Sequence, residues 1–279
     1  GKGGTGKTTY AAALGRIKAA KGKRTVVCEV DAQHSTMSAV FDSDIAYDPR
    51  EVLPNLSVCN LTWNDALGSY LERTVPVSGL VKRILANEVV NRFLDFTPGS
   101  RELVIWSQLG QLCEQYDTVI VDMPASGHAY SLLAVLLQIR QLFRGGPVRE
   151  RADQLLSLLN HPNTYLAFVC LPEEMVVNET IETFDKFQQH QWTQTTPFLF
   201  LNRGTRPTLT EDERALIQAL SDQDLTQEAG EFVRAGRWES DLETATNEAI
   251  VRLQTHLSAS PLVVSTRPKC GKQAEVVEH

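Results

Sequence analysis

The residues best suited to chemistry stand at the beginning of the sequence, where Gly1 to Thr9 reads GKGGTGKTT. This stretch fits the pattern G-x-x-x-x-G-K-[ST] at every fixed position, and a second lysine, Lys2, follows the first glycine. Glycines let the backbone curl until successive N–H groups point inward, where they can bind phosphate oxygens. The pattern therefore predicts a phosphate-binding loop rather than a flexible glycine-rich terminus.

The side chains of this loop have distinct expected roles. Lys7 supplies positive charge to the β and γ phosphates, Thr8 offers a hydroxyl ligand to Mg²⁺, and Thr9 offers a second hydroxyl near the α phosphate. A helix expected over residues 8–20 adds the positive end of its dipole. The predicted nucleotide-binding residues of the loop are Gly3, Gly4, Thr5, Gly6, Lys7, Thr8 and Thr9.

Two aspartates follow apolar runs that are typical of buried strands. Residues 23–30 are expected to form one strand, which ends at Asp31, and residues 118–121 another, which ends at Asp122. Ligand-facing groups in α/β sheets lie at the C-terminal ends of strands. Asp31 can therefore orient or deprotonate an attacking water, and Asp122 can hold Mg²⁺. The alternative for each aspartate is a local cap after its strand.

Two further segments carry candidate switch and base-binding groups. The glycine-containing turn over 124–127 is of the kind that senses a γ-phosphate. His128 has two interpretations that the sequence leaves open, a switch residue or a helix residue bonded to the backbone. A strand over 197–201 ends at Asn202, whose amide can read the edge of a purine or form a turn before Gly204.

The elements that position these residues alternate between strands and helices, which predicts an α/β fold with a mainly parallel sheet flanked by helices. A phosphate loop normally follows a buried strand, so we expect about six to ten apolar residues upstream of Gly1 in the natural protein. From residue 42 to about 98 the pattern is mostly helical, apart from a short candidate strand over 56–61, and indicates an α-helical insertion. Further strands are expected over 165–172 and 260–264, and helices over 101–115, 132–143, 148–159, 173–189, 210–219 and much of 225–257.

These elements indicate a single P-loop domain. We expect it to cover residues 1–265, with helical insertions at about 60–98 and 132–160. Residues 266–279 have the composition of a poorly ordered tail. The chain of 279 residues is long enough to bury a core of this size.

Composition restricts the classes of function. The sequence is 42% hydrophobic and 22% charged, and its net charge of -7 argues against broad nucleic-acid binding. No apolar run approaches the roughly eighteen residues of a membrane-spanning helix. The five cysteines are scattered singly, which suits a reducing cytoplasm and argues against a disulfide framework. We therefore expect a cytoplasmic protein with no integral membrane segment and no nucleic-acid partner.

With these landmarks placed, the chain resembles the ArsA-type ATPases: the arsenite-pump ATPase, the factor that targets tail-anchored membrane proteins, and their bacterial relatives. These belong to the deviant P-loop class, with MinD, ParA and the nitrogenase iron protein. Residues 1–9 match the signature of that class, and residues 122–128, DMPASGH, resemble the family's D-T-A-P-T-G-H switch II. Residues 171–180 also resemble a segment common in bacterial relatives. The resemblance covers most of residues 1–205.

The resemblance implies a homodimeric ATPase switch that uses ATP and Mg²⁺ and couples its nucleotide state to a protein client or cargo. It implies that Lys2 reaches across the dimer interface to the partner subunit's nucleotide, and that Asn202 contacts adenine. Asp31 matches the water-activating aspartate of switch I, and Asp122 the carboxylate on the Mg²⁺ side. The expected catalytic residues are Lys2, Lys7 and Asp31. The expected metal-binding residues are Thr8 and Asp122, and the switch residues Asp31, His34, Asp122, Gly127 and His128.

The sequence also departs from the family pattern. Switch I reads D-A-Q-H in place of D-P-A-H, and the lost proline loosens the loop and favours slow hydrolysis. The zinc-binding C-x-x-C of the targeting factor is absent, and three methionines offer little counterpart to its client groove. Arsenite transport and tail-anchored protein delivery are therefore not assigned. A non-hydrolysing nucleotide-dependent scaffold, a MinD-like or ParA-like positioning ATPase and a small-molecule kinase or synthetase on the same fold remain alternatives.

Overall fold

The chain, described here from a computed structural model, forms two compact units that each contain their own sheet. The structure describes residues 3–74, 99–190, 192, 194–221, 223 and 225–266. What we call the N-terminal unit comprises the described residues of 6–164 and 190–194. What we call the C-terminal unit comprises the described residues of 1–5, 165–189 and 195–269.

The N-terminal unit is built on a four-stranded sheet with the strand order β2-β3-β1-β4. Its strands are β1 (Thr25–Val30), β2 (Arg50–Leu53), β3 (Leu56–Leu61) and β4 (Thr118–Asp122). The β1 strand pairs in parallel with β3 and with β4, whereas β2 is antiparallel to β3. All six residues of β1 are buried, because this strand lies in the middle of the sheet. The parallel strands therefore present their C-terminal ends at one edge.

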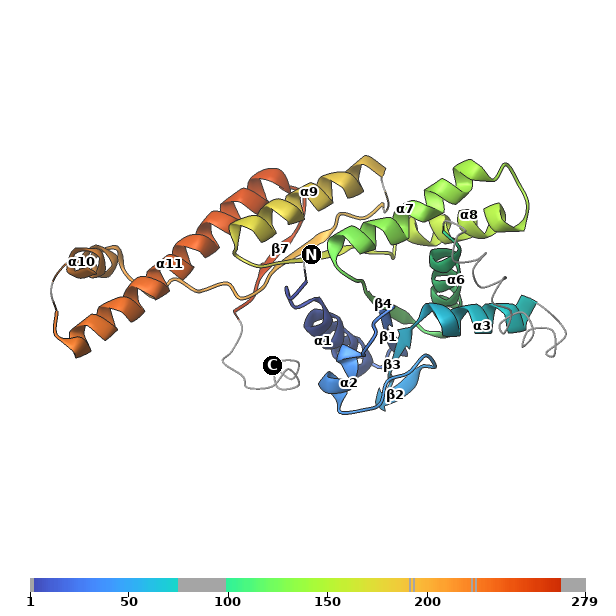
Figure 1. Ribbon diagram of the computed structural model, residues 1–279, viewed down its shortest axis with the longest axis horizontal. Coiled ribbons are helices and arrows are strands. Elements are labelled where there is room, and N and C mark those ends of the chain that lie inside the picture. Colours follow the sequence, from blue (N-terminus) through green and yellow to red (C-terminus); the bar gives the residue numbers. More distant parts are fainter. Residues whose placement is uncertain are drawn as a thin grey trace. The chain divides into compact units, whose positions relative to one another are not determined.

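The helices of the N-terminal unit pack on this sheet and on one another (Figure 1). They are α1 (Lys7–Ala20), α2 (Thr36–Phe41), α3 (Trp63–Thr74), α6 (Ser100–Gln115), α7 (Ser126–Leu142) and α8 (Pro147–Leu159). The α1 helix packs against β1 and β4, and Gly15 provides the space for the close approach to Val27 and Leu56. The α6 helix packs against α3, α7 and α8. The Trp106 indole donates a 2.7 Å hydrogen bond to the Leu132 carbonyl and so joins α6 to α7.

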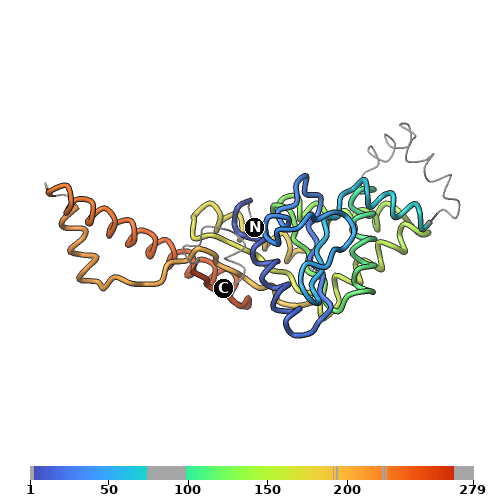
Figure 2. Tube along the Cα trace, turned by 90° about the horizontal axis from the view of Figure 1, so that it is seen from below, coloured from blue at the N-terminus to red at the C-terminus, as the bar shows by residue number. Residues whose placement is uncertain are grey.

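The C-terminal unit has a three-stranded parallel sheet with the order β5-β6-β7. Its elements are β5 (Ala167–Cys170), α9 (Glu174–His190), β6 (Phe198–Leu201), α10 (Glu211–Ser221), α11 (Gln227–His256) and β7 (Leu262–Val264). The α10 helix packs on α11. Figures 1 and 2 show α10 and the first half of α11, in orange, extending away from β5, β6 and β7 as a helical hairpin.

A buried carboxylate fixes the segment that leads into α10. Glu243 of α11 is 1% exposed, and its Oε1 accepts hydrogen bonds from the backbone N–H and the hydroxyl of Thr208 and from the N–H of Leu209. The guanidinium of Arg214 lies 3.3 Å from the second carboxylate oxygen. These contacts satisfy a charge that would otherwise be costly to bury.

The mainly parallel sheet flanked by helices is confirmed, whereas several local expectations need correction. The interpretation of residues 42–98 as mostly helical is wrong at β2, an edge strand whose charged residues hide the alternation expected of a strand. The β4 strand is half-buried along its length instead of buried on both faces. The α7 helix begins at Ser126, six residues before the expected start at Leu132. The second expected helical insertion, at about 132–160, therefore corresponds to the rest of α7 and to α8.

Other expectations fall on residues that the structure does not describe. Residues 75–98, which hold most of the first expected insertion, lie outside the described part, as do residues 267–279 of the expected tail. The single-domain interpretation of residues 1–265 stays a prediction. Among the described helices, none combines the length and the apolar character that crossing a membrane requires.

The close packing of α1 predicts the effect of a methyl group at Gly15. A Cβ atom there would lie 2.6 Å from Val27 Cγ2 and 3.1 Å from Leu56 Cδ1. We expect Gly15→Ala to lower the free energy of unfolding by about 1 to 3 kcal/mol, measured by urea denaturation, because overpacking outweighs the gain in helix propensity.

Gly230→Ala in α11 is the matched control. A Cβ atom at Gly230 would approach only the flexible end of Arg234, at 3.5 Å. The free energy of unfolding of this variant is expected to rise by up to about 1 kcal/mol, because alanine has a higher helix propensity than glycine. A stabilised Gly15→Ala variant would contradict the tight packing of α1 on the sheet.

Candidate functional site

The end of the predicted phosphate loop is joined to the end of β4 by one hydrogen bond. The Thr8 hydroxyl donates to Asp122 Oδ2 at 2.6 Å, although the two residues are 114 positions apart in sequence. Thr8 belongs to the first turn of α1, and Asp122 is the last residue of β4. The structure therefore brings together the two residues predicted to hold Mg²⁺.

The backbone before α1 has the shape that the glycine pattern predicts. Gly4 and Gly6 have φ angles of 79° and 97°, which residues with a Cβ rarely adopt. An added Cβ would meet no atom within 4 Å at Gly3 or at Gly4, so open space lies beside this backbone. Gly6 is the N-cap of α1, and Lys7 begins the helix. The N-terminus of a helix suits an anion.

The carboxylate of Asp122 lies in an environment that disfavours its charge. Burial raises the pKa of Asp122 to about 6, the hydrogen bond from Thr8 acts against this, and the nearby negative charge of Glu29 adds to it. The positive charge of Lys7 acts in the opposite direction to Glu29. A further cation at this place would offset the cost of two neighbouring carboxylates. A hydroxyl, a carboxylate and excess negative charge thus fit the oxygen ligands that Mg²⁺ prefers.

Asp31 follows β1 in a constrained turn. Its φ angle is 52°, in the left-handed region, and its backbone N–H donates to the Leu61 carbonyl at 3.0 Å. The side chains of Asp31 and His34 are exposed, as expected for groups that face a ligand or solvent. The loop of residues 31–35 then leads into α2.

Two residues that the sequence patterns did not point to hold this loop. Glu29 is 3% exposed in β1 and bonds to Ser35, Thr36 and Met37, and Asn60 of β3 is 6% exposed and bonds to the backbone of Ala32. The signal that could have found Glu29 is its charge inside the apolar run TVVCEV. Asn60 gives a weaker signal of the same kind, because it is a polar but uncharged residue near the end of the strand sequence LSVCNL.

The predicted switch II residues lie at the start of α7. Gly127 and His128 are exposed in its first turn, so the turn expected over 124–127 is shorter and helical from Ser126. The Gly127 carbonyl accepts a hydrogen bond from the Ser131 hydroxyl at 3.1 Å. This places His128 in the N-terminal turn of a helix, and its role in switching stays a prediction.

Asn202 lies in the C-terminal unit, and both ends of its amide are engaged. Its Nδ2 donates to the Thr5 carbonyl at 2.9 Å, and its Oδ1 accepts from the N–H of Arg203 at 3.0 Å. The amide thus binds the phosphate-loop backbone and also forms the local turn that the sequence left as an alternative. Adenine contact by Asn202 stays a prediction, as does the role of Lys2, which lies outside the described residues.

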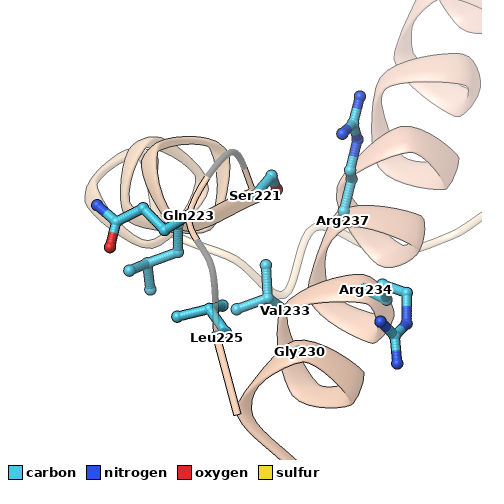
Figure 3. Close-up of a pocket in the computed structure, with 8 residues that line it drawn as sticks. Ser221, Gln223, Leu225, Gly230, Val233, Arg234 and Arg237 are labelled. Atoms are coloured by element: carbon cyan, nitrogen blue, oxygen red, sulfur yellow. The ribbon is translucent and has the colours of Figure 1, made fainter. Parts of the chain in front are cut away.

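A hollow of about 280 Å³ lies at the tip of the α10–α11 hairpin (Figure 3). Leu225 and Val233 project into it, and Arg234 and Arg237 of α11 border it. None of the predicted site residues lines this hollow. It is therefore separate from the phosphate-loop chemistry.

These features define a P-loop nucleotide-binding protein with a mainly parallel sheet. The loop precedes α1, the sheet presents its strand ends at one edge, and a carboxylate at the end of β4 meets the hydroxyl that follows the loop lysine. This combination of loop, hydroxyl and strand-end carboxylate is characteristic of phosphate-loop nucleotide hydrolases.

Comparison with known proteins identifies the family. The profile of the ArsA ATPase family, described as "Anion-transporting ATPase", matches residues 1–225. The chain therefore belongs to the ArsA-type ATPases, and the resemblance inferred from the motifs is confirmed.

Individual relatives are also named as ATPases. The chain is 27% identical over 206 residues to "ATPase BagA" of Mycobacterium tuberculosis, a match covering 68% of this chain and 59% of that protein. It is 29% identical over 140 residues to "Putative arsenical pump-driving ATPase 2" of Aquifex aeolicus, covering 48% and 46%. It is also 29% identical over 154 residues to "ATPase ASNA1 homolog" of Entamoeba histolytica, covering 51% and 46%. The matches thus span about half of the length of these relatives.

The environment of Asp122 predicts that Asp122→Asn stabilises the protein, and that the size of this effect depends on pH. Because burial raises its pKa from 3.8 to about 6, ionised Asp122 costs folding free energy, and this cost appears as pH rises through that interval. We expect Asp122→Asn to raise the free energy of unfolding by up to about 3 kcal/mol at pH 7.5 without Mg²⁺, and by about 1 kcal/mol at pH 4.5. Urea denaturation of both proteins at the two pH values measures the difference.

Asp65→Asn is the matched control, because exposed Asp65 also accepts a hydrogen bond from a threonine hydroxyl, that of Thr62 at 2.5 Å. Because Asp65 is exposed, its substitution relieves no cost of burying a charge, and the increase in free energy of unfolding predicted for Asp122→Asn at pH 7.5 is not expected. An equal change for Asp122→Asn at both pH values would mean that packing, and not charge, sets its effect.

Proposed function

We propose that this protein hydrolyses ATP to ADP and phosphate with Mg²⁺, and that it works as a homodimeric switch that couples its nucleotide state to a protein client or cargo. The observation that carries the proposal is the hydrogen bond from the Thr8 hydroxyl to Asp122. It assembles, at the end of the phosphate loop, the two oxygen donors that a nucleotide-bound Mg²⁺ needs.

Each residue then has a task that its position supports. The N–H groups of Gly3, Gly4 and Gly6 line the phosphates, and Lys7 places its ammonium beside the β and γ phosphates. Thr8 and Asp122 hold Mg²⁺, which when bound offsets charge on the phosphate oxygens. The exposed carboxylate of Asp31 orients the attacking water or accepts its proton. Thr5 and Thr9 complete the nucleotide-binding set, with Asn202 as the adenine contact.

The elements that follow the strand-end aspartates offer a path from nucleotide state to a surface. The loop after Asp31 leads into α2, and the short segment after Asp122 leads into α7, which packs on α6 and α8. A change at either aspartate therefore moves the start of a helix. His34, Gly127 and His128 stand at these junctions and are the proposed switch residues.

Dimerisation gives Lys2 a task that Lys7 cannot perform. A cation supplied by a second subunit would stabilise charge on the transferring phosphoryl group in the partner's site. We propose that the two compact units form the single ATPase domain of residues 1–265, since the phosphate loop passes from one to the other after Thr5. The scattered cysteines favour the cytoplasm as its location.

Two substitutions separate nucleotide binding from hydrolysis. Lys7→Ala is expected to weaken the binding of a fluorescent ATP analogue at least about 100-fold, since a charge-assisted phosphate contact is lost. Asp31→Asn is expected to keep the dissociation constant within about threefold and to lower phosphate release at least about 100-fold under single-turnover conditions.

Wild-type turnover in Asp31→Asn would remove this residue as the water-activating group. Tight nucleotide binding without phosphate release by the wild-type protein would favour the alternative of a non-hydrolysing scaffold. Gln33→Asn, at an exposed position in the same loop, shows whether any polar substitution there gives the same loss.

The cross-interface role of Lys2 predicts a loss of ATP-dependent dimerisation. Lys2→Ala is expected to bind ATP within about threefold of the wild type but to remain a monomer where the wild type dimerises, because the trans contact to phosphate is missing. Sedimentation velocity with ATP and Mg²⁺, with the Asp31→Asn background preventing turnover, measures this. Identical sedimentation of the two proteins would count against the role of Lys2 between subunits.

A further inference from the structure

Three polar residues form a row across the C-terminal edge of the N-terminal sheet. In the parallel register, Glu29 of β1 lies opposite Asn60 of β3 on one side and opposite Asp122 of β4 on the other. Paired residues in a sheet project to the same face, and Glu29 shares its face with Val27, against which α1 packs. Asp122 has a place in the proposed chemistry, whereas Glu29 and Asn60 do not.

We propose that Glu29 and Asn60 are positioning residues that clamp the loop of residues 31–35 and thereby set the location of the Asp31 carboxylate. This inference rests on the proposed ATP hydrolysis, because only that reaction gives the position of Asp31 a consequence. Neither residue needs to touch the nucleotide for this role.

Glu29 holds the far end of the loop. Its Oε1 accepts hydrogen bonds from the N–H groups of Thr36 at 2.8 Å and Met37 at 3.3 Å, and its Oε2 accepts one from the Ser35 hydroxyl. Ser35 is also the N-cap of α2, where its hydroxyl accepts from the N–H of Ser38. A single carboxylate thus fixes the point at which the loop becomes a helix.

Asn60 holds the near end of the loop. Its Nδ2 donates to the Ala32 carbonyl at 2.7 Å, and its Oδ1 accepts from the Ala32 N–H at 3.3 Å. The side chain therefore binds both polar groups of the residue directly after Asp31. The Asp31 N–H donates to Leu61, the residue that follows Asn60, so the backbone on each side of the Asp31 side chain is anchored to β3.

The cost of placing Glu29 here supports a role beyond capping. The carboxylate is 3% exposed, and its negative charge helps to raise the pKa of Asp122. Serine, threonine or asparagine would cap a short helix without burying a charge. A carboxylate differs in having enough acceptor sites for three donors at once, which is what holding Ser35, Thr36 and Met37 together requires.

The first test compares turnover with nucleotide affinity. Glu29→Ala is expected to lower kcat about tenfold or more while the dissociation constant for an ATP analogue changes less than about threefold, because misplacement of a reacting group affects the chemical step. Glu29→Gln keeps one acceptor oxygen for Thr36 and Met37 and should restore kcat to within about threefold of the wild type. Asn60→Ala should act in the same direction as Glu29→Ala.

Glu243→Ala is the matched control, since Glu243 is also a buried carboxylate that accepts backbone N–H groups, in the C-terminal unit. It should lower the melting temperature while kcat, counted per molecule that binds nucleotide, stays within about twofold of the wild type. An equal loss of kcat in Glu243→Ala and Glu29→Ala at equal distance below their melting temperatures would overturn the positioning role. So would the same low kcat for Glu29→Gln as for Glu29→Ala.

Hydrogen exchange tests the clamp independently of hydrolysis. The amides of residues 32–37 should exchange about tenfold faster or more in Glu29→Ala and Asn60→Ala than in the wild type, while those of β4 remain protected. Unchanged exchange would overturn the clamp. If the wild-type protein released no phosphate, the proposed hydrolysis would fail, and this measurement would still decide whether the two residues hold the loop.

Should Glu29→Ala not fold, Ser35→Ala removes one bond of the clamp at a half-buried position. It is expected to give a smaller loss of kcat, about twofold to fivefold, with faster exchange confined to the start of α2. Wild-type kcat together with wild-type exchange in Ser35→Ala would count against the clamp.

Discussion

The hydrogen bond between the Thr8 hydroxyl and Asp122 is the contact on which the candidate site depends. It joins the first turn of α1 to the end of β4, and α1 itself is seated on β1 and β4. Because α1 begins directly after the phosphate loop, its seating on the sheet also determines where the loop ends. Packing at Gly15 and polar contact at Thr8 therefore act on the same helix, one in its middle and one at its start.

Negative charge is concentrated beside that contact. Glu29 and Asp122 are paired across β1 and β4, and burial makes the ionised form of Asp122 unfavourable. Such an arrangement is costly in the absence of a cation, and the Mg²⁺ of the proposed reaction would offset this cost. The same row of polar residues also contacts the loop after Asp31, through Glu29 and Asn60. The proposed metal site and the proposed clamp of the loop thus share one edge of one sheet.

The residues with roles in the proposed ATPase are distributed over both compact units of the chain. The N-terminal unit holds Lys7, Thr8, Asp31 and Asp122, whereas the C-terminal unit holds Asn202 and the Thr5 carbonyl that it binds. The family match extends over residues 1–225 and thus includes residues of both units. The α10–α11 hairpin, with its own hollow at the tip, carries none of these groups.

The sequence by itself determined the class of site, because a phosphate loop is a local pattern in which glycine and lysine spacing already specifies the chemistry. It also identified β1, β3 and β4, since continuous apolar runs mark buried strands, and the aspartates at the ends of β1 and β4. It missed β2, whose charged residues conceal an edge strand, and it passed over Glu29 and Asn60. Only the tertiary structure decided the contacts of Glu29 and Asn60. Strand register, which brings residues 29, 60 and 122 into one row, arises from pairing between distant segments and leaves no local pattern.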